Sequence, residues 1–219
     1  MKKITIAFLL LLGTFSNSSA DIGLNIGVSG TMGVFHATAA DNEALDRQTQ
    51  DATAVVGMTS IFLEKTIPGM PRIAIGANWV TDPLSSETTE SVRYDQTEAS
   101  NTNTNRTNTV QVDFENLTSY YVSLLVTENM YVKAGFAEVD VETNEQLGTG
   151  STYGNTSMDA TLVGLGYNHT FDSTMFVRIE GTYMSFDDVQ LSATNNNDNK
   201  IELNQLEGLT GSISVGKAF

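Results

Sequence analysis

The chain has no cysteine, only two histidines, and few basic residues: 11 lysines and arginines stand against 26 aspartates and glutamates. Without cysteine, the protein has no disulfide, no thiolate nucleophile and no cysteine-ligated metal site. The acidic excess argues against nucleic-acid binding, because phosphates attract basic surfaces. No segment approaches about 18 consecutive apolar residues, the length typical of a membrane-spanning helix, which argues against a helical membrane protein.

The first 20 residues have the pattern of a secretory signal peptide. Lys2 and Lys3 precede an apolar run of nine residues, Ile4–Leu12, and small residues follow at Ser18–Ala20. The run is shorter than the roughly 20 residues of a spanning helix, although an N-terminal membrane anchor is the alternative interpretation. We therefore expect a leader at 1–20 and one domain of 199 residues, 21–219, in which nine basic residues face 26 acidic ones.

The C-terminal segment alternates strictly between large apolar and small or polar residues. Ile213, Val215 and the terminal Phe219 share one face, and Ser212 and Ser214 lie on the other. In a closed membrane barrel the last strand pairs with the first and presents its apolar face to lipid. We therefore expect this segment to close such a barrel and to serve as its assembly signal.

Similar alternation recurs along the rest of the chain and predicts an all-β protein, an eight-stranded antiparallel up-and-down transmembrane β-barrel. A periplasmic β-sandwich is the weaker alternative, because its outward face would be polar. The expected strands are Asp21–His36, Thr53–Glu64, Arg72–Asp82, Thr109–Glu128, Met130–Glu142, Thr156–Phe171, Met175–Gln190 and Lys200–Phe219.

The expected connections alternate between short and long, which predicts short turns and both termini in the periplasm and long loops outside. The longest connection is Pro83–Asn108, and its polar tract Asn101–Thr109 is expected to be a mobile, solvated spacer. A receptor or adhesion role for this loop is the alternative.

Three glycine- and aromatic-rich stretches carry a family resemblance: Tyr131–Phe136, Leu162–Tyr167 and Phe176–Tyr183. With the terminal phenylalanine, they resemble the outer membrane protein β-barrel domain family, which includes the OmpA and OmpX-type barrels and opacity-type surface proteins. The resemblance implies a Gram-negative outer membrane, insertion by the barrel-assembly machinery and contact with lipopolysaccharide. Lys217 departs from the aromatic residue that the family usually has at this position, and a lysine can snorkel to the membrane interface.

Charged residues fall on the inward face of the expected strands, where a narrow barrel has room only for side chains. Opposite charges in such a lumen would pair, so we expect a polar plug that prevents free conduction. A gated narrow pore is the alternative. The residues of this expected lumen network are Glu64, Arg72, Lys133, Arg178 and Glu180.

Most of the acidic residues lie in the long loops or in strand ends near them, from Asp41 to Glu202. A solvated outer surface is the simpler interpretation, and loosely bound Ca²⁺ or Mg²⁺ bridging to lipopolysaccharide phosphates is the alternative. The two histidines, His36 and His169, are expected near opposite ends of the barrel and cannot share a catalytic site. We expect no enzyme, no firmly bound cofactor or metal, and a monomer.

These observations predict an outer-membrane β-barrel with a structural or surface-interaction role in adhesion or envelope integrity. The competing prediction is a narrow channel for small or hydrophobic solutes.

Overall fold

In the computed structural model of the protein, the described residues are 23–43, 46–85, 88–97, 100–148, 150–171, 174–195 and 199–219. The predicted leader 1–20 lies outside them. Nearly all of the described residues are in strands: β1 Leu24–Glu43, β2 Asp46–Ile67, β3 Met70–Val80, β4 Leu84–Ser85, β5 Thr89–Thr97, β6 Ser100–Leu125, β7 Met130–Leu147, β8 Thr156–Thr170, β9 Met175–Phe186, β10 Val189–Ser192 and β11 Lys200–Ala218. Among these residues there is no helix that could cross a membrane.

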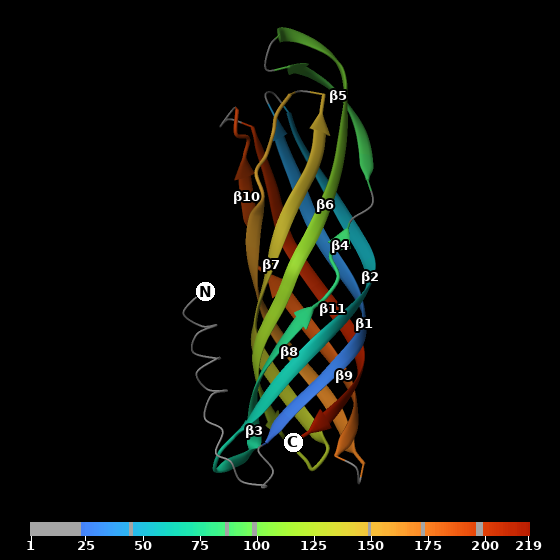
Figure 1. Cartoon of the computed structure of the whole chain (residues 1–219). Coiled ribbons are helices and arrows are strands. Elements are labelled where there is room, and N and C mark those ends of the chain that lie inside the picture. The colour runs from blue at the N-terminus through green and yellow to red at the C-terminus, as the bar shows by residue number, and fades with distance from the viewer. Residues whose placement is uncertain are drawn as a thin grey trace.

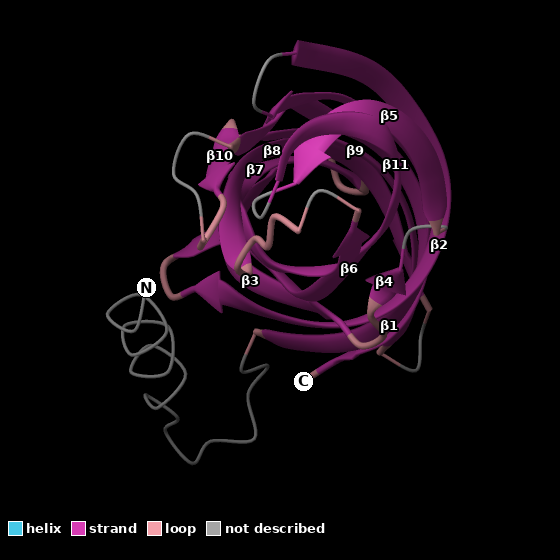
Figure 2. Cartoon of the chain, turned by 90° about the horizontal axis from the view of Figure 1, so that it is seen from above, coloured by secondary structure: helices cyan, strands magenta, loops and turns pink. Residues whose placement is uncertain are grey.

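Eight strands form a closed antiparallel ring in the order β1-β2-β3-β6-β7-β8-β9-β11, and β11 pairs again with β1 (Figures 1 and 2). The ring closes through reciprocal backbone hydrogen bonds between Leu24 and Phe219, at 3.2 and 2.8 Å. The predicted eight-stranded up-and-down barrel is therefore confirmed. The three short strands prolong the ring above β3 and β9, because β4 and β5 pair with β6 on the edge that β3 occupies, and β10 pairs with β11 on the edge that β9 occupies.

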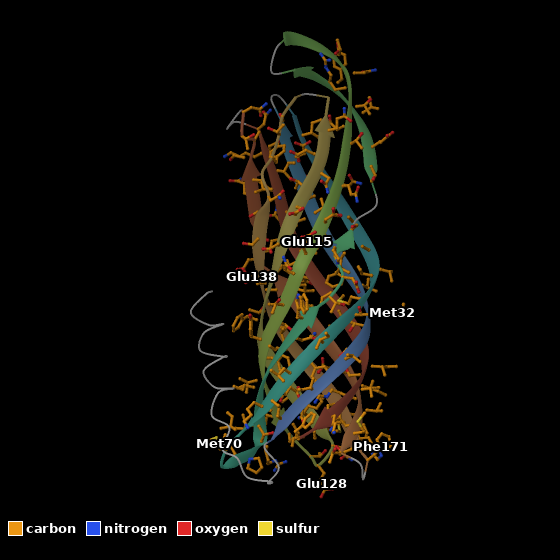
Figure 3. All side chains as sticks on the ribbon, in the orientation of Figure 1. Met32, Met70, Glu115, Glu128, Glu138 and Phe171 are labelled. Atoms are coloured by element: carbon orange, nitrogen blue, oxygen red, sulfur yellow. The ribbon has the colours of Figure 1, made fainter. Side chains whose placement is uncertain are left out.

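The outer wall of the ring is apolar over the half nearest the C-terminus. Ile26, Val28 and Met32 of β1 face outward, and Met32 is 68% exposed and points away from the barrel in Figure 3. Matching outward residues recur around the ring, including Val122, Val132, Val163, Ile179, Ile213 and Val215. Outward aromatic residues, including Tyr120 and Phe136 with ring centroids 5.4 Å apart, mark the upper edge of this apolar belt.

Several predicted loops are strands instead. The segment expected as the loop Ala37–Ala52 belongs mostly to β1 and β2, which stay paired as far as Glu43 and Asp46. The tract Asn101–Thr109 is not a spacer but part of β6, and its hairpin with β5 stands above the rest of the barrel in Figure 1. Alternation between apolar and polar residues indicates which face of a strand meets lipid or a core. It weakens in these segments above the belt, although the backbone pairing of the strands continues there.

The upper half of the barrel is filled by apolar side chains. Its cluster comprises Met58, Val80, Leu117, Tyr121, Ala137, Val139, Val141, Met158, Ala160, Leu162, Phe186 and Leu206. Phe114 and Val112 of β6 pack against this cluster, although uninterrupted alternation from Tyr120 would turn them outward. A β-bulge between Glu115 and Thr118 reverses the parity of the strand and directs them inside.

Asn116 makes the bulge possible, because its φ of 56° is in the left-handed region. Asparagine adopts this region more readily than most residues, and a β-branched residue does so rarely. A second bulge in β11 has Gln205 at a φ of 55° and directs Leu203 toward the same cluster. The two bulges thus turn apolar residues of β6 and β11 toward the cluster, whereas β7 and β8 contribute to it with unbroken alternation.

Replacing Asn116 tests this role of the bulge. We expect Asn116→Gly to unfold in urea near the wild-type midpoint, and Asn116→Val to lower the free energy of unfolding by about 1–2 kcal/mol. Thr161→Val, at an outward position of β8 with ordinary extended backbone, is the control and should be tolerated. Equal behaviour of the glycine and valine variants would contradict the explanation.

Candidate functional site

Four charged side chains meet inside the lower half of the barrel, near the turns that join β2 to β3 and β8 to β9. Glu64 lies near the end of β2, Lys133 is the fourth residue of β7, and Arg178 and Glu180 lie near the start of β9. Strand alternation turns all four inward. Glu64 is 2% exposed and Arg178 is 8% exposed, so both charges are removed from water. We refer to these four residues as the charged layer.

Glu64 and Arg178 form a bidentate ion pair. The two terminal nitrogens of Arg178 donate to the two carboxylate oxygens of Glu64, each at 2.7 Å. The Tyr121 hydroxyl donates to Glu64 Oε1 at 2.9 Å, and the Asn25 amide donates to Oε2 at 3.5 Å. The planar guanidinium matches the carboxylate fork, and the extra donors satisfy its remaining lone pairs, as a buried pair requires.

Three aromatic rings surround the guanidinium of Arg178. Its central carbon lies 5.0 Å from the ring centroid of Phe62, 4.9 Å from that of Tyr131 and 5.3 Å from that of Phe176. The ring faces attract the cation where water is absent. Glycine leaves space for these rings, since a Cβ at Gly27 would collide with Phe62 and lie 2.7 Å from the Val215 carbonyl oxygen.

Lys133 and Glu180 form a second ion pair beside the first. The Tyr131 hydroxyl also donates to Glu180, and the Thr182 hydroxyl donates to Glu180 Oε1 at 3.0 Å. Lys133 Nζ lies 4.8 Å from the ring centroid of Tyr121, whose hydroxyl reaches Glu64. Tyr121 and Tyr131 therefore join the two pairs into one network with two positive and two negative charges.

Arg72 was expected in this network and does not belong to it. Its side chain is exposed, and its Nε and Nη2 donate to the backbone carbonyls of Leu125 and Val126, at 3.0 and 2.8 Å. β3 begins at Met70, so Arg72 lies at the rim of the barrel although its parity is inward. Its role in the structure is to hold the end of β6 rather than to fill the lumen.

The aromatic members of the network were not recognised from the sequence. Aromatic type by itself favours the lipid interface for Tyr131 and Phe176, but they are 4% and 2% exposed and lie inside. A signal was present, because Tyr131 has the parity of Lys133, and Phe176 has the parity of Arg178. Aromatic type alone does not distinguish a lipid interface from a cation cage.

The residues of the predicted assembly signal line the outer wall of β11 and its end. Ile213, Val215 and Phe219 are 62%, 45% and 44% exposed. Lys217 Nζ lies 4.8 Å from the ring centroid of Phe219, so the lysine and the terminal ring contact each other.

The two histidines lie on different parts of the outer surface. His36 Nδ1 hydrogen-bonds the Thr53 hydroxyl at 3.1 Å, whereas the ring of His169 packs edge-on against Phe171, with centroids 4.9 Å apart. His36 lies far along β1 from the closing end, and His169 lies one residue before the end of β8. The structure does not bring them together.

Six carboxylates form an acidic wall on the outer surface of β6, β7 and β8: Asp113, Glu115, Glu138, Asp140, Glu142 and Asp159. Like charges lie directly opposite in the strand register, as Glu138 does with Asp159 and Glu115 with Asp140. Figure 3 labels Glu115 and Glu138 near the middle of the barrel, well above Glu128 and Phe171 at the lower end. Within the described chain, no three acidic or histidine residues are arranged to hold a metal ion.

Comparison with solved structures identifies the fold as that of outer-membrane β-barrels. The outer membrane protease OmpT from Escherichia coli aligns with a TM-score of 0.51 and 10% identity, over 93% of this chain and 99% of that chain. The outer membrane protein OprG from Pseudomonas aeruginosa aligns with a TM-score of 0.49 and 12% identity, over 91% and 98%. No family model and no curated relative matches the sequence. At 10% identity the likeness to OmpT shows the fold alone.

Removing one partner of the Glu64–Arg178 pair should destabilise the barrel strongly. We expect Glu64→Leu, which leaves the Arg178 charge buried without its partner, to lower the free energy of unfolding by about 3–5 kcal/mol. The double variant Glu64→Leu/Arg178→Met should recover most of this loss. The measurement is urea unfolding in lipid vesicles, followed by the different gel mobilities of folded and heat-unfolded protein.

Arg72→Met is the matched control, because it removes an arginine from the exposed rim, where water can hydrate the freed carbonyls. It should cost much less than Glu64→Leu. If the double variant were as unstable as the single one, the pair would not be the source of the loss.

Proposed function

We propose that this protein resides in the outer membrane of a Gram-negative bacterium as a closed barrel similar to the OmpA, OmpX and opacity-type proteins. The observation that supports this location is the apolar belt, which would be costly in water and fits the hydrocarbon of a bilayer. Each strand of the described ring pairs with a neighbour on both sides, as a membrane barrel requires.

We place both ends of the barrel domain in the periplasm. The short turns after β2, β6 and β8 lie at the same end as Leu24 and Phe219, whereas the extended hairpins lie at the other end (Figure 1). Outer-membrane barrels have short periplasmic turns and longer extracellular connections. Insertion by the barrel-assembly machinery, with Ile213, Val215 and Phe219 as the recognised face, is part of this proposal.

The function that we propose is structural or surface-interacting, in adhesion or envelope integrity, rather than transport. The observation that carries it is the filled lumen, because the charged layer closes the lower half and the apolar cluster closes the upper half. The surface that remains for interaction is the polar outer end, formed by the β1–β2 and β5–β6 hairpins. On the latter, Val92 and Tyr94 are 67% and 71% exposed.

A narrow channel for small or hydrophobic solutes is the second candidate. It is favoured by the apolar upper lumen, where Phe35, Val112 and Phe114 are only partly buried at the edge of the cluster. Opening would require these side chains and the charged layer to move apart. We further propose that the protein is not an enzyme, since His36 and His169 have neither a shared site nor a carboxylate among the partners described above.

Conductance separates the two candidates. In planar bilayers we expect the wild-type protein to show no steady conductance, because ions have no continuous aqueous path past the filled lumen. Arg72→Met should behave identically, since its side chain lies outside the lumen. A steady, large conductance of the folded wild-type protein would contradict the structural role and favour the channel.

We also propose that the outer surface meets lipopolysaccharide, and that the acidic wall attracts Mg²⁺ or Ca²⁺ loosely between its carboxylates and the lipid phosphates. Burial raises the pKa of the Glu138 carboxyl, and the neighbouring charges of Asp159 and Asp140 raise it further. Like charges opposite one another destabilise a sheet, and a cation between them relieves that repulsion. Because one chain completes the ring, the proposed form is a monomer without a firmly bound cofactor.

Glu138→Gln tests the repulsion in the acidic wall. A carboxyl whose pKa is raised in the folded state stabilises the fold below its ordinary value of 4.5 and loses that contribution as the pH rises through the raised value. We expect the variant to melt at a higher temperature than the wild type at pH 7, and at the same temperature below pH 4.5. Millimolar Mg²⁺ should reduce the difference at pH 7.

The control for this measurement is Glu128→Gln, which removes one negative charge from an exposed turn at the opposite end of the barrel. The difference between its melting temperature and that of the wild type should be the same with and without Mg²⁺. A Glu138→Gln difference that persisted unchanged with Mg²⁺ would overturn the cation proposal while leaving the repulsion itself in place.

A further inference from the structure

A small polar cavity of about 50 Å³ lies inside the barrel between the charged layer and the apolar cluster. Hydroxyl groups from five strands line it, and Asn78 adds an amide. Arg178, Lys133 and Glu180 form its lower side, and Met58, Val80, Leu117 and Met184 form its upper side. The lining hydroxyls include those of Ser29, Ser60, Ser119, Thr182, Thr210 and Ser214.

Three polar atoms of residues that line this cavity have no hydrogen-bond partner among the residues that the structure describes. They are the Ser60 hydroxyl, the amide oxygen of Asn78 and Nε of Arg178. Ser60 is 3% exposed and Arg178 is 8% exposed, so bulk solvent does not supply the partners. Buried polar groups without partners are rare in native proteins, because each one has lost its hydrogen bond to water.

The chemistry of these atoms restricts what can bind. Arg178 Nε–H needs an acceptor, and the Asn78 oxygen needs a donor. A metal cation cannot accept from Arg178, and a simple anion cannot donate to Asn78. The charges of the layer are also already matched, since Glu64 pairs with Arg178 and Glu180 pairs with Lys133. The cavity therefore suits a small neutral molecule that both donates and accepts.

We propose that the cavity is an occluded hydration site, which holds ordered water between Ser60, Asn78 and Arg178. One water needs roughly 10–15 Å³ of such space and two to four polar partners, and the cavity meets both requirements. Its volume admits more than one water. This inference rests on the closed lumen that is part of the proposed function. It adds that water is enclosed between the two halves of that lumen.

The water is enclosed by two barriers of different chemistry. Below it, the ion pairs and the rings of Phe62 and Tyr121 close the lumen, and above it the packed side chains of Met58 and Leu117 exclude water. Breaking the ion pairs would therefore join the cavity to the periplasmic mouth without opening a path through the barrel. The Lys133→Ala/Glu180→Ala variant, which removes these side chains from the lower side of the cavity, should remain non-conducting for this reason.

Magnetisation transfer from water tests the site directly. In the protein folded into lipid nanodiscs, NMR should show cross-peaks from water to the Arg178 Nε–H and to the Ser60 amide. The sign of these cross-peaks should be the one expected for a water molecule with a long residence time in the protein. The double variant Ser60→Val/Asn78→Leu removes two partners and should lose them. Ser123→Ala, whose hydroxyl bonds the Ala74 carbonyl outside this cavity at 3.5 Å, should retain them. Absence of the cross-peaks in the wild type would overturn the proposal.

Thiol labelling tests the enclosure, since the natural chain contains no cysteine. The thiol of a Ser60→Cys variant should resist a small methanethiosulfonate reagent in the folded protein, and the thiol of Thr59→Cys, on the outer surface, should react quickly. Adding Lys133→Ala/Glu180→Ala, which removes these side chains from the lower side of the cavity, should expose the Ser60→Cys thiol. Rapid labelling without these changes would overturn the enclosure.

The two proposals fail in different ways. Steady conductance of the wild type would defeat the closed lumen itself. If the wild type showed no conductance and also no cross-peaks from water, only the proposed hydration site would be wrong.

Discussion

The pairing of β11 with β1 is the constraint on which the rest of the structure depends. It satisfies the backbone groups of the first and last strands at once and removes the two edges that an open sheet would leave. Once the ring is closed, the two faces of every strand have different surroundings. One face meets the outside, and the other meets a lumen too narrow for much besides side chains.

That narrow lumen explains why the interior has two chemically different halves. Along the belt, the apolar side chains point outward to the lipid, so the polar side chains point into the lumen. Glu64 and Arg178 are stable there only as a fully hydrogen-bonded pair. Above the belt the outer wall is polar, and the inward face becomes an ordinary apolar core. In β6 and β11 the bulges at Asn116 and Gln205 contribute to this change, because they reverse the parity of these two strands, whereas β7 and β8 pass from one half to the other without a bulge.

The same division is the basis of the closed lumen that we propose. Charged groups that satisfy one another leave no net charge to attract an ion, and packed apolar side chains leave no room for water. The polar cavity lies where the two halves meet, and its hydroxyl groups border both. A closed barrel of this kind presents only its outer wall and its hairpins to other molecules, which is why the proposed role lies at the surface.

The sequence by itself determined the strands of the belt, their number and the inward direction of Glu64, Lys133, Arg178 and Glu180, because alternation with a period of two records which face meets lipid. It did not determine the height of a residue along the barrel, so Arg72 was expected in the lumen and lies at the rim. It also did not reveal the paired strands above the belt, such as 101–109, because backbone hydrogen bonds leave little trace in side-chain type. Only the tertiary structure decided which carboxylate pairs with which cation, and that Tyr131 and Phe176 lie around Arg178. These contacts join strands that are far apart in sequence, and closure of the ring sets the relative register of those strands.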